Sequence, residues 1–156
     1  MIVQDLFGKQ GYHTMVIAIG SDHRGYNVKQ RIINFLSGMG HEVLDMGPGN
    51  EDCVDYPDFA HPTATSVEIG EAAFGILFCG SANGVAMTAN KHAGIRAGLC
   101  WQTDVAELTR LHNNANMICI PARYVSIELA KEMIEKFMST AFEGGRHQNR
   151  VQKISC

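Results

Sequence analysis

Short apolar runs alternate with amphipathic stretches along the chain from residue 15 onward. Five runs have the length and composition of buried strands and lie at residues 15–20, 42–46, 74–80, 95–100 and 117–120. The stretches between and after them predict helices at about 28–39, 59–73, 84–91, 103–113 and from 127 onward. Strands and helices therefore alternate through one continuous unit.

Two of the predicted helices show clear periodicity. The first carries one apolar stripe and is followed by Gly40, a common helix stop; the stripe comprises Val28, Ile32, Phe35, Leu36 and Met39. The last begins after Ser126, a favourable N-cap residue, and its stripe comprises Ile127, Ala130, Ile134, Phe137 and Met138. Both stripes are expected to pack against a sheet.

The alternation predicts an α/β fold with a parallel sheet and helices on both faces, because each crossover has to return the chain to the same end of the sheet. Residues 15–156 then form a single domain, and residues 1–14 form an N-terminal extension without clear periodicity. Ligands bind beyond the carboxyl ends of the strands in such sheets. The candidate loops lie at residues 20–25, 47–57, 79–84, 101–103 and 121–123.

Charge and cysteine content narrow the functional classes. The 156-residue chain has a formal net charge of −3, which gives no field that would attract nucleic acid or an anionic membrane. No apolar run reaches the roughly 18 residues that a membrane span needs, so we expect a cytoplasmic protein. The five cysteines lack CxxC spacing, which favours reduced thiols over disulfides, and Cys100 and Cys119 are expected to pack in the core.

Known nucleotide and metal motifs are absent. The chain has no GxxxxGK[ST] sequence, and residues 20–25 lack the GxGxxG pattern of dinucleotide-binding proteins. HExxH is also absent, and the seven histidines are scattered along the sequence. These observations disfavour a nucleotide cofactor and a metal site.

Cys79 stands where a predicted strand gives way to a predicted helix. Strand formers, small residues and a helical pattern follow one another in Ile76-Leu77-Phe78-Cys79-Gly80-Ser81-Ala82-Asn83-Gly84-Val85-Ala86-Met87. Unpaired backbone N–H groups at a helix start can bind an anion and lower the pKa of the thiol. Core packing of Cys79 is the alternative. Ser81 suits a proton relay or a helix cap, and Gly80 and Gly84 allow a ligand oxygen to approach the backbone.

Asp22, His23 and Tyr56 are candidates in other predicted loops. Asp22 and His23 follow the first strand, where both side chains can face a ligand; alternatively, Asp22 caps the next helix and His23 is solvated. Tyr56 precedes a proline that favours an extended conformation. Its ring can close over a small ligand or cover the edge of the core.

His112 and the C-terminal tail complete the set of candidates. His112 lies near a predicted helix end, where a histidine is also a common partner of the helix dipole. The tail Glu143-Gly144-Gly145-Arg146-His147-Gln148-Asn149-Arg150 places two arginines and a histidine after a flexible double glycine. Arginine forks suit phosphate oxygens, so the tail predicts a local anion site, with a solvated basic terminus as the alternative.

Together these residues resemble the type B ribose-5-phosphate isomerase family, which also includes allose-6-phosphate and galactose-6-phosphate isomerases. The resemblance runs from about Val16 to Ile154. It rests on six ordered motifs: Ser21-Asp22-His23-Arg24-Gly25, Asp55-Tyr56-Pro57, Cys79-Gly80-Ser81, residues 89–96, Arg110-Leu111-His112-Asn113 and residues 143–151. Six motifs in the family's order are far more specific than any one of them.

The resemblance implies a Rossmann-like, three-layer αβα sandwich with a five-stranded parallel sheet. It also implies a homodimer or a tetramer of two dimers, with active sites at the subunit interface. The implied activity is cofactor-independent aldose–ketose isomerisation of ribose 5-phosphate and ribulose 5-phosphate. An isomerase of a six-carbon sugar phosphate and a non-catalytic sugar-phosphate-binding module are the alternatives, whereas nucleic acid and membranes are not expected as partners.

The resemblance further implies catalytic roles. Cys79 is the base that moves a proton between C2 and C1 through a cis-enediol, and Ser81 helps to transfer protons between the sugar oxygens. His112 opens the furanose ring, with Asp22 and Tyr56 as its partners. Backbone N–H groups of the 80–84 loop, which includes Gly80, Asn83 and Gly84, stabilise the enediolate oxygen.

Substrate-binding roles follow from the same resemblance. Asn113 holds sugar hydroxyls. The phosphate-binding residues, some from the neighbouring subunit, are His23, Arg123, Arg146, His147 and Arg150. Family members place the base either on the cysteine after the third strand or on a glutamate six residues later; here these positions are Cys79 and Val85, which indicates the cysteine-base subclass. Ala82 departs from the glycine common in this loop, and its Cβ is expected to restrict a positive φ or to crowd the substrate.

Overall fold

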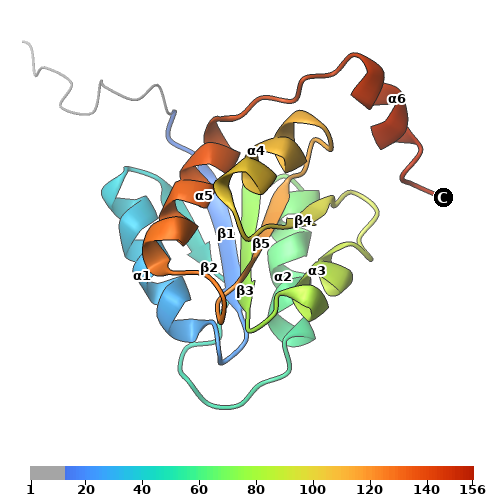
Figure 1. The fold of residues 1–156 in the computed structure, drawn as a ribbon. Coiled ribbons are helices and arrows are strands. Elements are labelled where there is room, and N and C mark those ends of the chain that lie inside the picture. The colour runs from blue at the N-terminus through green and yellow to red at the C-terminus, as the bar shows by residue number, and fades with distance from the viewer. Residues whose placement is uncertain (1–12) are drawn as a thin grey trace, which may run out of the picture.

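The computed structural model describes residues 13–156, within which five strands and six helices follow one another (Figure 1). The strands are β1 (Val16–Ser21), β2 (Glu42–Asp45), β3 (Phe74–Cys79), β4 (Ala97–Leu99) and β5 (Met117–Pro121). The helices are α1 (Tyr26–Gly38), α2 (Pro57–Glu68), α3 (Asn83–Ala89), α4 (Thr103–Leu111), α5 (Ile127–Ser139) and α6 (Arg146–Gln152). The expected extension at residues 1–14 lies almost entirely outside the described residues.

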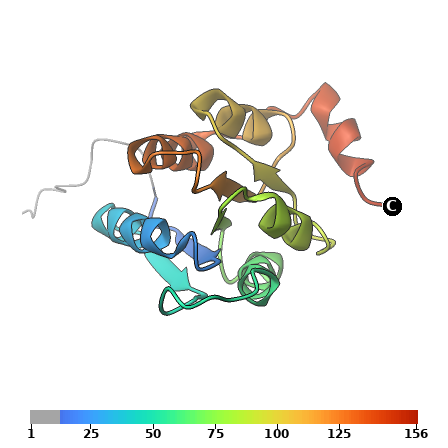
Figure 2. The same cartoon turned by 60° about the horizontal axis from the view of Figure 1, so that its bottom comes forward.

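All strand pairings are parallel, and the sheet order is β2-β1-β3-β5-β4. One core cluster joins the sheet to α1, α4 and α5, and a second joins it to α2 and α3. Figure 2 shows these two helix layers on opposite sides of the strands. The predicted three-layer αβα sandwich with a five-stranded parallel sheet is therefore confirmed. Within residues 13–156 no helix is long and apolar enough to cross a membrane.

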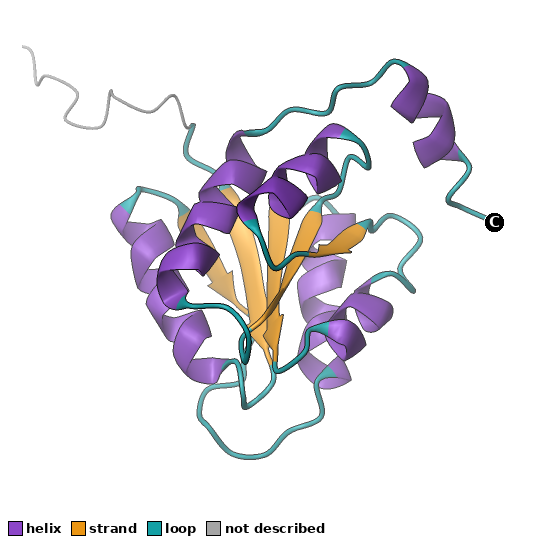
Figure 3. Cartoon of the chain, in the orientation of Figure 1, coloured by secondary structure: helices purple, strands orange, loops and turns teal. Residues whose placement is uncertain are grey.

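Several elements differ from their predicted extent; helix α2, for example, ends at Glu68 and not near residue 73. Strand β4 is shorter than the apolar run at 95–100 because the backbone N–H of Ile95 bonds to the His92 carbonyl and that of Arg96 to the side chain of Asn116. The tail, for which we predicted no helix, contains helix α6, which follows two glycines with positive φ. Figure 3 shows an extended segment carrying α6 away from the body of the sandwich.

The buried thiols behave as the sequence predicts for Cys100 and Cys119. Both are fully buried, and the backbone N–H of Cys100 donates to the carbonyl of Cys119 on the neighbouring strand. Burial raises the pKa of Cys100 to about 12 and also raises that of Cys119. Cys53 and Cys156 are exposed, and all five cysteines are free.

His41 gives the fold a predicted dependence on pH. Its Nδ1 accepts a hydrogen bond from the backbone of Met15, its Nε2 is buried without a partner among the described residues, and burial lowers its pKa. In the unfolded chain His41 binds a proton near pH 6.5, whereas in the folded chain it binds one only at lower pH. The free energy of unfolding should therefore fall as the pH decreases below about 6.5. The melting temperature of His41→Gln should decrease less than that of the wild type between pH 7.5 and pH 5. An identical decrease in the two proteins would contradict this assignment.

Candidate active site

The carboxyl ends of β1, β3 and β5 meet at one edge of the sheet. The order of the sheet reverses between β1 and β3, which is the place where open α/β sheets bind ligands. Backbone hydrogen bonds join the loops there: Asp22 donates to the Phe78 carbonyl at 3.1 Å, and Arg123 donates to the Gly80 carbonyl at 3.2 Å. This edge therefore holds several predicted site residues in fixed positions.

Cys79 is the last residue of β3 and is buried, with only 8% of its surface exposed. Burial, the negative charge of Asp22 and a hydrogen bond to that carboxylate raise the pKa of its thiol; backbone N–H groups of Ala82 and Ser81 act in the opposite sense. Our prediction of a lowered thiol pKa is therefore wrong for the single chain. The predicted N–H groups are present, but desolvation and the neighbouring carboxylate outweigh them.

The loop after Cys79 takes the conformation in which a glycine is usually found. Ala82, the N-cap residue of α3, has φ = 61° and ψ = 3° and is fully buried. Ser81 accepts a 3.4 Å hydrogen bond from the backbone of Asn83, so its hydroxyl lies at the helix start. The expected conflict between a Cβ and positive φ is present, yet the loop keeps this left-handed geometry.

Ala82→Gly should raise the free energy of unfolding by roughly 0–1 kcal/mol, because relief of left-handed strain is offset in part by greater freedom of the unfolded chain. Ala89→Gly is the matched control, since Ala89 is equally buried but lies within helix α3. It should lower the free energy by about 1 kcal/mol or more. Chemical denaturation measures both, and equal losses would show that Ala82 is not strained.

Tyr56 and Gly84 make a close contact across the site. A Cβ built on Gly84 would lie 2.4 Å from Cζ of Tyr56, so the tyrosine ring covers the start of α3. Tyr56 is 39% exposed and is the N-cap residue of α2. Its φ of −57° and ψ of −32° are helical, so the extended conformation predicted before Pro57 is wrong: the Tyr56 carbonyl already accepts the first backbone hydrogen bonds of the helix. The ring therefore stands over the loop that carries Cys79, as expected for a side chain that borders a ligand.

Asp22 and His23 both organise neighbouring backbone. Asp22 is almost fully buried and accepts a 2.9 Å hydrogen bond from the backbone of Gly25, so it caps the turn before α1 and also faces Cys79. Nδ1 of His23 accepts a 3.2 Å hydrogen bond from the backbone of Val54. This bond fixes the ring and links the loop after β1 to the long loop after β2, leaving Nε2 as the nitrogen available to a ligand.

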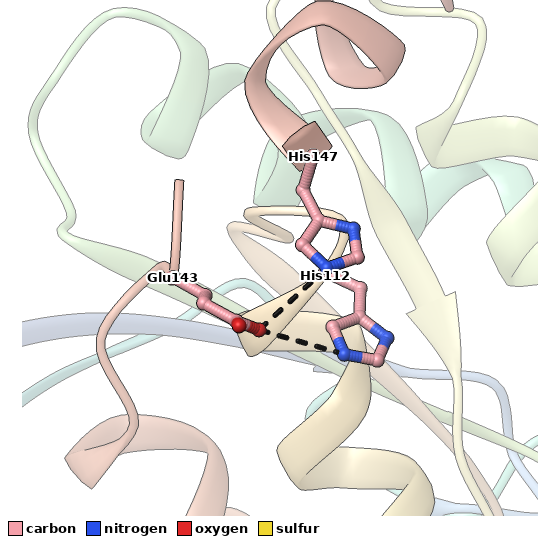
Figure 4. A group of neighbouring side chains, drawn as sticks. All are labelled: His112, Glu143 and His147. Atoms are coloured by element: carbon pink, nitrogen blue, oxygen red, sulfur yellow. Dashed lines mark ion pairs between the residues drawn. The ribbon is translucent and has the colours of Figure 1, made fainter. Parts of the chain in front are cut away.

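A second group forms around the end of α4. Glu143 Oε2 lies 3.7 Å from Nε2 of His112 and 3.6 Å from Nε2 of His147, and the two imidazole rings stack with centroids 4.2 Å apart (Figure 4). The Glu143 backbone donates to the Leu111 carbonyl at 3.0 Å, which holds the segment against α4. Desolvation lowers the pKa of His147, and His112, Arg146 and Arg150 add to this, whereas Glu143 acts against it.

The two groups lie at opposite edges of the sheet. Helix α4 starts beside the carboxyl end of β4 and returns to the amino end of β5, so His112 and Asn113 stand at the amino edge. Strands of five or six residues separate this edge from Cys79 by about 17–20 Å. Figure 1 accordingly shows α6 at the end of the molecule opposite to the arrowheads.

One chain therefore brings together only part of the predicted set. At the carboxyl edge are Asp22, His23, Tyr56, Cys79, Gly80, Ser81, Asn83, Gly84 and Arg123. At the amino edge are His112, Asn113, Arg146, His147 and Arg150. Glu143 lies within the last of the six motifs, but the sequence does not predict a functional role for it; its place four positions before His147 is the one signal of such a role.

Fold and site define an α/β enzyme with a thiol–carboxylate pair at the carboxyl edge of a parallel sheet. The sequence profile of the Ribose/Galactose Isomerase family matches residues 17–154. The chain belongs to this family, and it is a sugar-phosphate isomerase by class.

Curated and structural relatives cover nearly the whole chain. Ribose-5-phosphate isomerase B of Escherichia coli strain K12 is 42% identical over 140 residues, spanning 90% of this chain and 94% of the relative. The crystal structure of a ribose 5-phosphate isomerase from Thermotoga maritima superposes with a TM-score of 0.90 at 46% identity, covering 92% and 99% of the two chains. That of ribose-5-phosphate isomerase B from Mycoplasma genitalium, with bound ribulose-5-phosphate, gives 0.87 at 39% identity, covering 91% and 95%.

Proposed function

We propose that the protein interconverts ribose 5-phosphate and ribulose 5-phosphate. The observation that carries this proposal is the Cys79 thiol beside Asp22 at the edge where parallel sheets bind ligands. Support comes from relatives named ribose-5-phosphate isomerase B and from the Mycoplasma genitalium structure with bound ribulose-5-phosphate. The left-handed conformation of Ala82 argues against the non-catalytic alternative, because the loop keeps its shape despite the Cβ.

The isomerisation moves one proton between carbon atoms and one between oxygen atoms. Cys79, as thiolate, removes the proton from C2 of the open-chain aldose and returns it to C1 of the cis-enediol. Ser81 transfers the proton between the two sugar oxygens. Backbone N–H groups of the 80–84 loop stabilise the negative oxygen, a contribution of about 3–4 kcal/mol for each well-placed donor.

Ring opening and phosphate binding require the groups of the other edge. His112 donates a proton to the ring oxygen, a role suited to a side chain that exchanges protons near neutral pH. Asp22 and Tyr56 assist by holding the sugar, and Asn113 binds its hydroxyls. The phosphate is held by His23, Arg123, Arg146, His147 and Arg150. Guanidinium groups match phosphate oxygens with paired hydrogen bonds.

The residues at the carboxyl edge and those at the amino edge are thus two half-sites. They make one complete site only if a second copy of the chain supplies its amino edge. We therefore include a homodimer in the proposal, in which Cys79 of one subunit faces His112 of its partner. A twofold axis then generates two identical sites. Helix α6 supports this arrangement, because it stands away from its own sandwich at the end of an extended segment (Figure 3).

Exposed apolar side chains border the β4 edge of the sheet and favour contact with a second copy. Met87 on α3, Trp101 after β4 and Leu108 on α4 are 67%, 50% and 44% exposed. They flank an edge strand, and both features are common where proteins associate. The positive groups of a partner's α6 would also oppose the effect of Asp22 on the pKa of Cys79.

An activity screen tests the proposed substrate. The purified chain should convert ribose 5-phosphate to a ketose and should be much less active on the 6-phosphates of allose and galactose. A preference for either six-carbon substrate would replace ribose 5-phosphate in the proposal. Thermal stabilisation by the sugar phosphates without conversion of any of them would identify a binding module instead.

A further inference from the structure

Three side chains from two separate parts of the sequence converge at the amino edge of the sheet. His112, Glu143 and His147 each offer one ligand atom, and these atoms lie within 4.8 Å of one another. Figure 4 shows the glutamate carboxylate beside the two stacked rings, facing one nitrogen of each histidine. Within residues 13–156 no other group of three histidine, cysteine or acidic residues is gathered as closely.

The spacing is close to that of a zinc site. Zinc binds imidazole nitrogen and carboxylate oxygen at about 2.0–2.2 Å, so neighbouring ligand atoms in a tetrahedral site are about 3.4 Å apart. The two nitrogen-to-oxygen distances at Glu143, 3.7 Å and 3.6 Å, already approach this value. Two histidines and one glutamate are also a known ligand set for zinc.

To bind a metal ion, the side chains still have to change orientation, and those that must move are the most exposed of the three. The two rings are stacked with an angle of 13° between their planes, whereas a bound metal has to lie near the plane of each ring. Rotation of His112 satisfies this requirement, and the side chains of His112 and Glu143 are 37% and 55% exposed. The His147 side chain is 7% exposed and provides the fixed ligand.

His147 also has a buried ring nitrogen that makes no hydrogen bond within residues 13–156. Its Nε2 is buried and forms no hydrogen bond with any described residue; it has only the ion pair with Glu143, at 3.6 Å. A buried polar atom usually has a partner, and an exception calls for an explanation such as an ion. This nitrogen is the one that points to Glu143, at the centre of the group.

We propose that His112, Glu143 and His147 form a site for a divalent transition-metal ion of the zinc type. The fourth position is open to water. Nitrogen ligands favour zinc, nickel or copper over magnesium and calcium. Arg146 and Arg150 are positive charges close to His147 and oppose a cation, so the expected affinity is weaker than that of a structural zinc site.

Binding of the metal has a consequence that rests on the proposed function. The ion takes the nitrogen of His112 that protonates the sugar ring and the nitrogen of His147 that holds phosphate. Metal and sugar phosphate then exclude each other at the shared site. The metal is therefore a competitive inhibitor and not a cofactor, and removal of metal by EDTA leaves full activity.

The binding test uses the chain without a histidine tag and with Cys79→Ala, so that neither a tag nor the site thiol contributes. The exposed thiols of Cys53 and Cys156 are first alkylated. Zinc titration by calorimetry should give one ion per chain, and cobalt should show visible absorption typical of tetrahedral nitrogen and oxygen coordination. Because calorimetry measures binding and not turnover, the result is independent of the proposed function.

Two matched substitutions locate the ion. Glu143→Gln should weaken zinc binding by about tenfold or more, since it removes one of three ligands without changing side-chain size. Glu68→Gln disrupts another glutamate–histidine pair, that of Glu68 and His92, 3.5 Å apart, and should leave the affinity unchanged. No binding, or equal affinity in the parent and Glu143→Gln, would overturn the proposal.

Kinetics test the inhibition separately. Zinc should raise the KM for ribose 5-phosphate in the wild-type chain without changing kcat, and the effect should be at least tenfold weaker in Glu143→Gln. An unchanged KM at zinc concentrations that saturate the site would overturn the inhibitory role. If the chain isomerises no sugar phosphate at all, the proposed function fails, whereas calorimetry still decides the metal site.

Discussion

Cys79→Ala should lower kcat for ribose 5-phosphate isomerisation by about a thousandfold, because general base catalysis contributes roughly 10²–10⁴ in rate. The fold should remain intact, since alanine keeps the Cβ at the end of β3. Coupled assay of ribulose 5-phosphate formation gives the rate. Cys100→Ala is the matched control: this cysteine is also buried at the carboxyl end of a strand but lies outside the site, so its variant should keep most of the activity.

The pH profile adds a second readout for Cys79. Burial and Asp22 raise the pKa of its thiol in the single chain, so only a small fraction is thiolate at neutral pH. The wild-type kcat/KM should therefore increase with pH across the neutral range, as the thiolate fraction grows. Cys79→Ala should lose this increase. Retention of most of the wild-type rate by Cys79→Ala would remove Cys79 from the role of base.

His112→Gln should lower activity on ribose 5-phosphate by about a hundredfold, because proton donation to the ring oxygen is lost. It should have little effect on a four-carbon aldose 4-phosphate, such as erythrose 4-phosphate, which cannot close a furanose ring. This comparison separates ring opening from proton transfer at carbon. His61→Gln is the control, as His61 is an exposed histidine paired with His92 outside both half-sites.

Equal losses on the two substrates would contradict the assignment of His112 to ring opening. That result would instead indicate a role in binding or in the enediol step. The ratio of the two rates is therefore more informative than either rate alone.

Much of the fold could be predicted because buried parallel strands are continuous apolar runs. The run ending at Cys79 gave β3, and its transition into small residues located the site loop. The amphipathic stripe after Ser126 predicts α5. Ser126 caps this helix, since its hydroxyl accepts a 3.1 Å hydrogen bond from the backbone N–H of Leu129. These elements follow from local pattern alone.

Helix α6 could not be predicted in this way. It has only seven residues and buries only His147 and Val151, so it lacks the apolar stripe that indicates a helix. The chemical state of Cys79 was mispredicted for a different reason. Its neighbour Asp22 directly follows β1, 57 positions earlier, and only the pairing of β1 with β3 places that carboxylate beside the thiol.

Convergence of the scattered histidines also depends on tertiary structure. His112 and Glu143 meet because the backbone bond between Glu143 and Leu111 joins the segment after α5 to the end of α4. Spacing in the sequence gives no sign of this contact. The separation of the two half-sites likewise becomes apparent only when the direction of α4 relative to the strands is known.

The division of the site between two subunits is tested most directly by mixing the two inactive variants. In a heterodimer of Cys79→Ala and His112→Gln chains, one site carries both defects and the other carries none. Random reassembly of equal amounts should therefore restore about a quarter of the wild-type activity, since half of the dimers are heterodimers with one intact site each. If heterodimers form, as native mass spectrometry can establish, but activity stays at the level of the parents, Cys79 and His112 do not act across the interface.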